Sequence, residues 1–328
     1  MIEYLYLGRV SYDEGLRLQA EIAGLRAEGR VGNVLLLLEH PPVLTLGRNA
    51  NRAHVLATNE LLAARGVTLH EINRGGDVTY HGPGQLVGYP IFDLRSLRNP
   101  NGGRMGPVDF VRLMEEALIR LCGRFGVRAG RIAGLTGVWC GSAGNDEQGL
   151  GTKGLGTEGL GTEGLGTKGL GTKGLGTEGL GTEGLGTGNG YAERERKIGA
   201  IGIHVARGIT SHGFAFNVTT DLRDFELIVP CGIPDHAVTS LERELALDCE
   251  AGRPEELPAL EAVAHETARQ FGLVFDERVL AVESLAALRA EAEAAAGTGP
   301  EFPAEDTPMR VPAEVERLRH KEGRPVQA

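Results

Sequence analysis

The sequence lacks the features that mark membrane, secreted and nucleic-acid-binding proteins. No apolar run approaches the roughly 18 residues that a membrane-spanning helix needs. The first residues contain neither a basic segment nor a cleavage site, so we expect no signal peptide. The four cysteines are widely spaced and form no CxxC pair, which favours reduced thiols and a cytoplasmic location. A net charge of −10 argues against nucleic acid and against an anionic membrane as the main partner.

Motifs for metals and nucleotide cofactors are absent as well. The sequence contains no HExxH motif and no cluster of Cys and His with zinc-ligand spacing, so we expect no metal site. It also contains no GxxxxGK[ST] phosphate loop. The glycines between residues 75 and 84 lack the strand–GxGxxG–helix context of a dinucleotide site. We therefore expect no cofactor, and the sequence gives no support for the use of ATP.

Short apolar segments alternate with helical patterns along most of the 328 residues. Residues 34–38 are continuously apolar, which predicts a strand that is buried on both faces. Residues 107–122 and 257–271 carry apolar side chains at helical spacing, and residues 283–296 predict a further helix. The pattern predicts an α+β (mixed α/β) fold, in which one sheet of about seven strands is packed against helices.

One tract differs from the rest of the chain. Gly-Leu-Gly-Thr recurs eight times from Gly149 to Thr187, separated by single Lys or Glu residues. A period of five matches neither a helix, a strand nor the three-residue repeat of collagen, and its many glycines make ordering costly. We expect residues 149–188 to be a flexible insertion in a single domain of residues 1–272. Residues 273–328 predict a helical and disordered C-terminal extension.

Residues 74–90 are rich in glycine and proline and also contain several polar side chains. Five glycines and two prolines accompany Arg74, Tyr80 and His81 within seventeen residues. Glycine is favourable where the backbone needs a positive φ or where another group approaches closely, and proline stiffens the chain. We expect a rigid loop, neither a helix nor a packed strand, that forms the wall of a binding site. The alternative is a turn between two strands with no ligand.

Cys231 differs from the other cysteines in its surroundings. It follows an apolar segment, predicted to be a strand, and lies between Pro230 and Gly232, where a turn would expose it. Either Cys231 is a nucleophile with neighbouring N–H groups as an oxyanion hole, or it fills the end of the strand. Cys122 lies on the apolar side of a predicted helix, and Cys140 follows Trp139, so both are predicted to be packing residues.

A reactive cysteine needs a nearby cation, because only a few per cent of an ordinary thiol is ionised at pH 7. A positive charge lowers the thiol pKa. Lys197, which begins an alternating strand pattern, is one candidate, and His81 and His212 are others. The residues alone leave open which of the three acts.

Several stretches together form a recognisable set, namely residues 39–42 with 45–48, 74–90, 137–139, 197–202, 212–217 and 230–233. In content and in order they resemble the lipoyl(octanoyl) transferases, which are relatives of the biotin and lipoate protein ligases. The resemblance covers most of residues 1–272 but not the repeat or the C-terminal extension. It implies a catalytic domain of the biotin/lipoate-ligase type, with helices packed on a mostly antiparallel central sheet.

The same resemblance implies roles for individual residues. Cys231 would carry the acyl group as a thioester, and Lys197 would lower the pKa of its thiol. The implied substrate contacts are Arg74, Gly75, Gly76, Asp77, Val78, Thr79, Tyr80, His81, Ala200, Ile201, Gly202, Gly213, Phe214 and Ala215.

The implied reaction transfers an octanoyl group from octanoyl-acyl carrier protein to a lysine of a lipoyl domain, as the first step of lipoate formation on proteins. The implied acceptors are lipoyl domains of 2-oxoacid dehydrogenases and glycine cleavage proteins. Since these partners are usually acidic, we expect a basic rim that includes Arg48, Arg52 and Arg74. The alternatives are an ATP-dependent lipoate or biotin ligase of the same fold and a catalytically silent acyl- or lipoyl-binding module.

Overall fold

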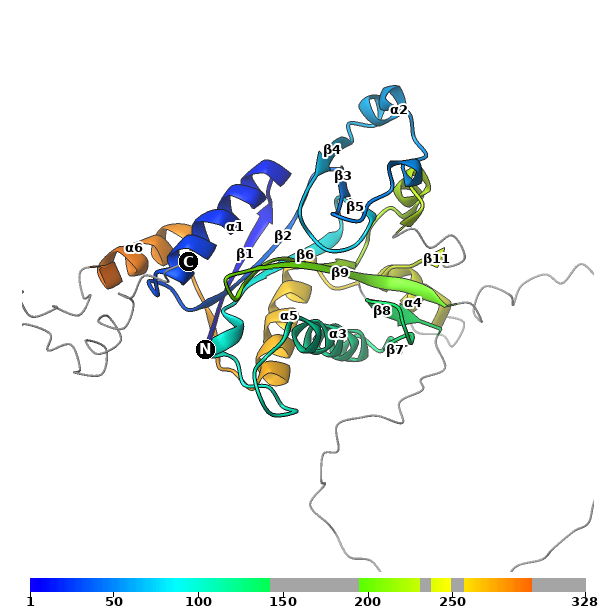
Figure 1. Ribbon diagram of the computed structural model, residues 1–328. Coiled ribbons are helices and arrows are strands. Elements are labelled where there is room, and N and C mark those ends of the chain that lie inside the picture. Colours follow the sequence, from blue (N-terminus) through cyan, green and yellow to red (C-terminus); the bar gives the residue numbers. More distant parts are fainter. Residues whose placement is uncertain (142–194, 231–236, 249–256, 297–328) are drawn as a thin grey trace, which may run out of the picture.

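The computed structural model describes residues 1–141, 195–230, 237–248 and 257–296 (Figure 1). The predicted insertion at 149–188 and Cys231 lie outside these described residues, as do residues 297–328 of the predicted C-terminal extension. Among the helices that are described, each is too short or too polar to cross a lipid bilayer.

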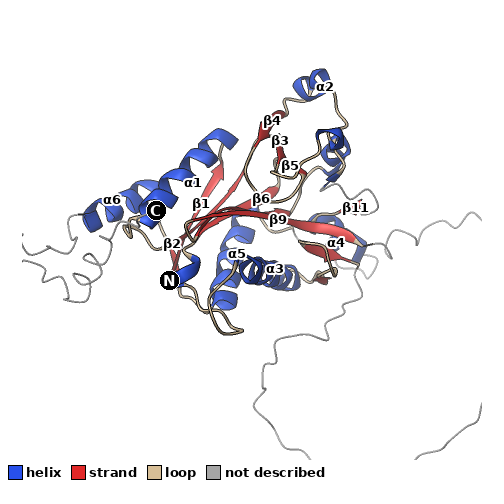
Figure 2. Cartoon of the chain, in the orientation of Figure 1, coloured by secondary structure: helices blue, strands red, loops and turns tan. Residues whose placement is uncertain are grey.

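A mixed nine-stranded sheet forms the centre of the described chain (Figure 2). Its strands are β1 (Ile2–Arg9), β2 (Asn33–Glu39), β6 (Gln85–Ile91), β7 (Ala129–Gly130), β8 (Val138–Cys140), β9 (Arg196–Ala206), β10 (Ile209–Asn217), β11 (Ala237–Val238) and β12 (Val279–Ala281). They run in the order β12-β1-β2-β6-β10-β9-β8-β7, and β11 pairs with β9. Five of the eight pairings are antiparallel, so the predicted fold class, with its mostly antiparallel sheet, is confirmed.

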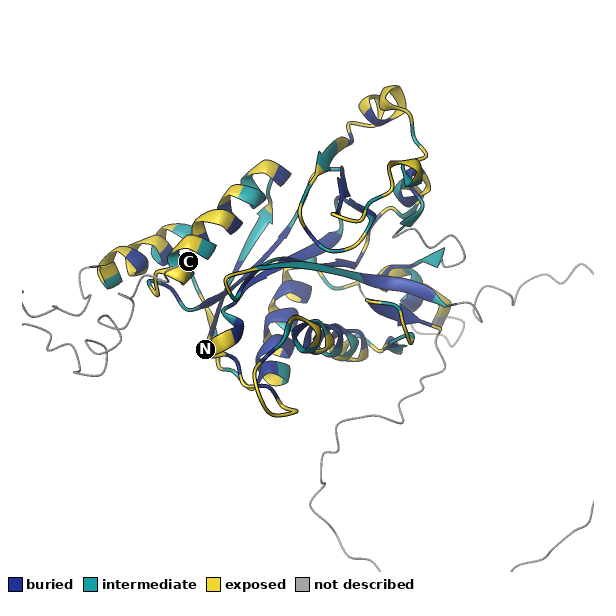
Figure 3. Ribbon diagram, viewed as in Figure 1, coloured by how far each residue is buried: buried dark blue, intermediate teal, exposed yellow. Residues whose placement is uncertain are grey.

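Helices cover both faces of this sheet (Figures 1 and 3). α3 (Pro107–Arg124) and α5 (Leu260–Phe275) lie on one face, and α1 (Tyr12–Ala27) and α6 (Leu285–Ala296) lie on the other. α4 (Leu241–Asp248) follows β11. α1 begins where the sequence predicts, because the Ser11 hydroxyl accepts a hydrogen bond from the Glu14 N–H and caps the helix.

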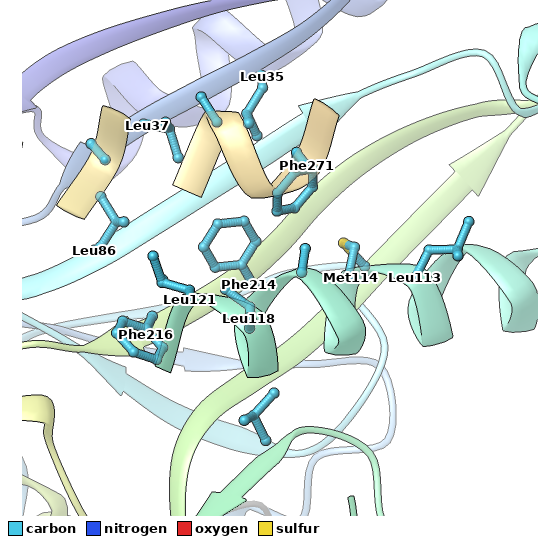
Figure 4. Packing of buried hydrophobic residues seen from close by; sticks show 14 of the residues in the cluster. Leu35, Leu37, Leu86, Leu113, Met114, Leu118, Leu121, Phe214, Phe216 and Phe271 are labelled. Carbon is cyan, nitrogen blue, oxygen red and sulfur yellow. The ribbon is translucent and has the colours of Figure 1, made fainter. Parts of the chain in front are cut away.

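β2 serves two hydrophobic cores at once. Leu35 and Leu37 pack with α3 and α5 (Figure 4), whereas Leu36 and Leu38 pack with α1 and α6. All of these side chains are fully buried, which confirms the prediction of a strand buried on both faces. Successive residues of a strand point to opposite faces, so one continuous apolar run supplies both cores.

A second sheet of three strands was not predicted. β3 (Val43–Leu46) lies between β4 (Thr68–Glu71) and β5 (Val78–His81), next to α2 (Asn59–Ala64). Two short 3₁₀ helices, η1 (Arg52–His54) and η3 (Leu222–Leu227), also belong to this region, and a third, η2 (Leu94–Ser96), follows β6. The expectation of one sheet is therefore wrong. Pro41 and Pro42 end β2, since proline cannot donate a ladder hydrogen bond, and the chain leaves the central sheet there.

Three further expectations need correction. Residues 74–90 are not mainly loop, because they contain β5 and all of β6 except Ile91, and every residue of these two strands is buried. The apolar segment before Pro230 is largely the 3₁₀ helix η3, which begins with Asp221 as its capping residue, and is not a strand. The predicted boundary at residue 272 falls inside α5, and β12 beyond it pairs with β1 in the central sheet.

Candidate active site

A cavity of about 200 Å³ lies between the central sheet and the segment that leads into β5. Its walls come from the N-terminus of α1, from β5, β6, β9 and β10, and from the chain before β8. The lining residues are Tyr12, Arg74, Gly75, Gly76, Asp77, Thr79, His81, Val87, Tyr89, Thr136, Lys197, Ala200, Ile201, Gly202, His212, Gly213, Phe214 and Ala215.

The pairing of β9 with β10 builds the floor of the cavity. Ala200 pairs with Ala215, and Gly202 pairs with Gly213. Gly202 lies five positions after Lys197, which corresponds to about 17 Å along an extended strand. The cavity is therefore elongated, with Lys197 toward one end.

Gly202 lets the segment at residues 74–77 approach β9 closely. A Cβ atom at this position would lie 2.7 Å from the carbonyl oxygen of Gly75, too close for any side chain. The Gly75 N–H also donates a hydrogen bond to the carbonyl oxygen of Ile203, at 3.0 Å. The segment is thus attached to β9 by its backbone, which leaves the cavity between them narrow.

Arg74 is buried beneath this segment. Its guanidinium donates to the carbonyl oxygen of Thr45 at 2.7 Å and to the Thr45 hydroxyl at 2.9 Å, and it also donates to the carbonyl oxygen of Gly75. The expectation that Arg74 belongs to an exposed basic rim is therefore wrong. Arg48 and Arg52 are exposed, and Arg52 forms an ion pair with Glu71 at 3.1 Å.

The structure brings together twelve of the fourteen predicted substrate contacts around the cavity. The other two, Val78 and Tyr80, are not among its lining residues. Successive side chains of β5 alternate, so Thr79 and His81 face the cavity while Val78 and Tyr80 pack in the core of the second sheet. The Tyr80 hydroxyl donates to Asp224 at 2.6 Å, and burial raises its pKa.

His81 and His212 are neutral near pH 7. Burial lowers the pKa of His81 to about 3 and that of His212 to about 4, because desolvation disfavours the charged imidazole. Each ring N–H has an amide acceptor at 2.7 Å, Gln85 for His81 and Asn73 for His212. Neither histidine supplies a positive charge, which leaves Lys197 of the three candidate cations.

Lys197 lies on β9, largely buried, with its Nζ atom 4.9 Å from the centroid of the Trp139 ring. It also lines a small second cavity of about 10 Å³ that is shared with Thr79, Asn217 and Pro230. The full sequence has 34 lysines and arginines, of which five are lysines, at positions 153, 168, 173, 197 and 321. Lys197 is the lysine that falls within the described residues, so nearly every other cation there is an arginine.

Cys231 itself lies outside the described residues, but both flanking segments are described. On one side, Pro230 lines the same small cavity as Lys197. On the other side, β11 pairs with β9 so that Val238 lies opposite Lys197, and the Thr239 N–H donates to the Lys197 carbonyl oxygen at 2.9 Å. The chain therefore leaves and re-enters the described structure next to Lys197. Cys122 and Cys140 are fully buried, which confirms them as packing residues.

Four residues that line the cavity were not predicted: Tyr12, Val87, Tyr89 and Thr136. Tyr89 donates a hydrogen bond from its hydroxyl to Nε2 of His40 at 2.6 Å, while Nδ1 of His40 donates to the carbonyl oxygen of Val10. Val87 and Tyr89 alternate along β6, within the stretch that the sequence singled out. Tyr12 reaches the cavity because α1 packs across β6 and β10, and no local pattern reveals that crossing.

No group of three or more His, Cys, Asp or Glu side chains that could hold a metal ion occurs in the part of the chain that the structure describes.

Comparison with known proteins gives one consistent result. Residues 11–257 match the lipoyl protein ligase A/B catalytic domain. The octanoyltransferase of Acidobacterium capsulatum is 50% identical over 285 residues, which cover 87% of this chain and 94% of that protein. The octanoyltransferase of Koribacter versatilis is 42% identical, with 97% of both chains covered.

Solved structures show the same fold at low sequence identity. Lipoate-protein ligase A bound with ATP superposes with a TM-score of 0.52 at 14% identity, over 90% of this chain and 94% of that one. A bipartite lipoate protein ligase from Thermoplasma acidophilum, solved in a study that included its E2 lipoyl domain, gives a TM-score of 0.50 at 15% identity, over 90% and 91% of the two chains.

Proposed function

Since this chain belongs to the lipoyl protein ligase A/B catalytic domain family, we propose that it transfers an octanoyl group from octanoyl-acyl carrier protein to a lysine of lipoyl domains. The acceptors are the lipoyl domains of 2-oxoacid dehydrogenases and glycine cleavage proteins. Relatives at 50% and 42% identity are named octanoyltransferase, and one fold relative was studied together with an E2 lipoyl domain.

The observation that carries this proposal is a narrow cavity with a lysine toward one end. Its floor and walls are mostly apolar side chains and glycine backbone, which suit a linear acyl chain. Burial of the seven carbons beyond the octanoyl carbonyl, at roughly 0.8 kcal/mol each, supplies several kcal/mol of binding free energy. The acyl chain would extend from Lys197 toward Gly202 and Tyr89.

The chemistry is a double displacement at the acyl carbonyl. The Cys231 thiolate attacks the thioester of the donor, and a thioester to Cys231 forms as the bond between the acyl carbon and the carrier sulfur breaks. The carrier leaves as a thiol with the proton that Cys231 had given to Lys197. The lysine amine of the acceptor then attacks this second thioester. The amide bond forms, the bond to Cys231 breaks, and the proton lost by the amine returns to the Cys231 sulfur. Each step is chemically balanced, and neither requires ATP.

Lys197 would stabilise the Cys231 thiolate and exchange the proton with the leaving group. Two observations support this role. Pro230, the chain neighbour of Cys231, shares a cavity with Lys197, and adjacent Cα atoms lie only about 3.8 Å apart. Apart from the histidines, the other basic side chains of the described residues are arginines, whereas this position has lysine. A lysine can release its proton, and an arginine in a protein cannot.

The deciding experiment is incubation of the full chain with octanoyl-acyl carrier protein in the absence of ATP, followed by peptide mass spectrometry. We expect one octanoyl adduct on the peptide that contains Cys231, and its transfer to an added lipoyl domain. The Cys140→Ala variant, which changes a buried cysteine, should form the same adduct. A Cys231→Ala variant that still transfers octanoate would overturn the proposal. A requirement for ATP with free octanoate would identify a ligase, and binding without transfer would identify an acyl-binding module.

A further inference from the structure

Glu115 is a buried carboxylate that lies outside the cavity. It belongs to α3, its side chain is fully inaccessible to solvent, and it is not among the residues that line the cavity. A buried carboxylate is costly unless each oxygen has partners. The partners of Glu115 therefore show what its presence accomplishes.

The two oxygens of Glu115 serve different purposes. Oε2 accepts hydrogen bonds from Arg112 at 2.7 Å and from Arg131 at 3.1 Å, which compensate the negative charge. Oε1 accepts a hydrogen bond from the backbone N–H of Gly137 at 3.0 Å. Both guanidinium groups reach solvent, and Arg131 also pairs with Glu116. The Gly137 N–H is buried.

Gly137 in turn lies directly against the side chain of Lys197. Its φ is +125°, and a Cβ atom there would lie 2.6 Å from Cε and 3.4 Å from Nζ of Lys197. The backbone of Gly137 thus occupies the space beside the end of the lysine side chain. Thr136, the preceding residue, lines the cavity.

The pairing of β8 with β9 shifts register at the same place. Val138 pairs with Gly199, but the next residue, Trp139, pairs with Lys197. A bulge of this kind re-aims side chains at a sheet edge. Here it places the indole of Trp139 next to the ammonium of Lys197, at 4.9 Å from the ring centroid.

We propose that Glu115 is a positioning residue, which fixes the Gly137 backbone and the adjacent bulge and so holds the Lys197 ammonium over Trp139. The contribution of Glu115 is geometric, because Arg112 and Arg131 neutralise its charge. The consequence for acyl transfer rests on the proposed function, in which Lys197 assists the reacting sulfur. The geometric statement itself does not depend on that function.

Other titratable groups near Lys197 belong to different elements. Arg74, Asp77, His81 and His212 share the main cavity with it, and the neighbouring Arg196 is paired with Glu244. The Gly137 N–H donates its hydrogen bond to Glu115. A change that is confined to Glu115 therefore leaves the other groups in place and alters the support of Lys197.

Trp139 is the single tryptophan of the chain, so its fluorescence reports directly on this arrangement. Each measurement compares two proteins that differ only by Lys197→Met, first in the wild type and then in a Glu115 variant. The quantity measured is the difference in Trp139 emission between the two proteins. In the wild type this change records the removal of a charge 4.9 Å from the indole. We expect the change to disappear in the Glu115→Met background, because the unsupported bulge no longer brings the two groups together.

Two further variants separate geometry from charge. Glu115→Gln keeps an acceptor oxygen, which should turn to the buried Gly137 N–H because Arg131 also pairs with Glu116 and the Arg112 guanidinium reaches solvent. The emission change should therefore persist. Glu115→Asp keeps the charge but withdraws the oxygen by one methylene, so the change should again be lost. Glu115→Asp also serves as the decisive variant if Glu115→Met does not fold. Glu116→Met is the matched control, since Glu116 pairs with Arg131 but not with Gly137.

An emission change of wild-type size in Glu115→Met or Glu115→Asp would overturn the proposal. If Lys197 acts as proposed, the same variants should lower kcat by up to about 100-fold with little effect on KM, since small misplacements near reacting atoms have effects of this order. Glu115→Gln should restore kcat. Loss of the emission change with unaltered kcat would leave Glu115 as a positioning residue and would instead count against the role of Lys197 in transfer.

Discussion

The Nζ atom of Lys197 lies 4.9 Å from the centroid of the Trp139 ring, and the same two residues are paired across β8 and β9. A cation over an aromatic face is stabilised by about 0.5–2 kcal/mol, depending on how far it is desolvated. The backbone pairing and the cation–π contact thus fix both ends of the lysine. Lysine side chains are usually among the most mobile in a protein, but these contacts restrict the conformation of Lys197.

Replacement of Lys197 should change the ionisation of the reacting thiol. If the ammonium stabilises the Cys231 thiolate, Lys197→Ala raises the thiol pKa, and the alkylation profile moves to higher pH. A shift of one pKa unit corresponds to about 1.4 kcal/mol and to a roughly tenfold slower reaction at low pH. Alkylation followed peptide by peptide measures this. The buried Cys122 and Cys140 provide internal controls that should remain unreactive. An unchanged profile for Cys231 would remove Lys197 from the mechanism.

The buried histidines should make the protein less stable in mild acid. Unfolded histidine has a pKa near 6.5, whereas the folded pKa of His212 is about 4 and that of His81 is about 3. Below about pH 6.5 the unfolded chain binds protons that the folded chain does not. The free energy of unfolding should therefore be fully present above pH 6.5 and fall toward pH 4, by up to about 1.4 kcal/mol per pH unit for each histidine.

Urea unfolding at several pH values tests this dependence. His212→Asn removes one titrating group and should flatten the curve between pH 6.5 and pH 4. Asparagine suits the site because His212 has a φ of +55°, a conformation that asparagine tolerates. Replacement of the exposed His265 by Asn serves as the control. An equally steep curve for His212→Asn and the wild type would contradict the prediction.

Gly202→Ala should disturb the cavity without removing any polar side chain. The new Cβ would lie 2.7 Å from the Gly75 carbonyl oxygen, so the segment at residues 74–77 must move away from β9. Overpacking of this kind costs about 1–3 kcal/mol. We expect a lower unfolding free energy and slower acylation by octanoyl-acyl carrier protein. Gly24→Ala, in α1 with no heavy atom within 4 Å of its Cβ, is the matched control and should be neutral or slightly stabilising.

The pair of Arg196 and Glu244 should be important for stability. Arg196 donates from Nε and Nη2 to the two oxygens of Glu244 at 2.9 and 2.8 Å, and both side chains are buried. Loss of one partner of a buried ion pair is destabilising, by up to about 3–5 kcal/mol. Chemical denaturation of Glu244→Ala should reveal a loss of this size. Glu242→Ala, at an exposed position of the same helix, should lie within about 0.5 kcal/mol of the wild type.

The sequence predicts well those elements that carry a signal in their own residues, such as an apolar run, a helical spacing or a capping residue. The apolar run of β2, the helical spacing of α3 and the Ser11 cap of α1 each carry a local signal, and each element appears where it was expected. The segment at residues 225–229 shows the limit of this approach. Its apolar side chains suit a strand, but the Asp221 cap starts a 3₁₀ helix that packs against the second sheet.

Most residues that line the cavity could be named from the sequence, but their geometry could not. The stretch from Arg74 to Pro90 was singled out by its composition, yet the alternation of β5 decides that Thr79 faces the cavity and Tyr80 does not. Tyr12 and Glu115 were missed because their roles depend on where α1 and α3 cross distant strands. Such crossings are set by tertiary packing and leave no short-range pattern.

Because β2 is buried on both faces, its hydrogen-bonding register with the neighbouring strands cannot be set by hydrophobicity alone. A slip of one residue reverses the face of every side chain in a strand, but here both faces are apolar, so hydrophobicity alone barely opposes the slip. The polar residues at the two ends of the strand therefore fix its register through their hydrogen bonds. Asn33 accepts from Arg26 and from the Asp93 N–H, and Glu39 accepts from Arg9 and from the Gly84 N–H. Two hydrophilic residues thus select the one register in which both cores, and the cavity beyond them, are assembled.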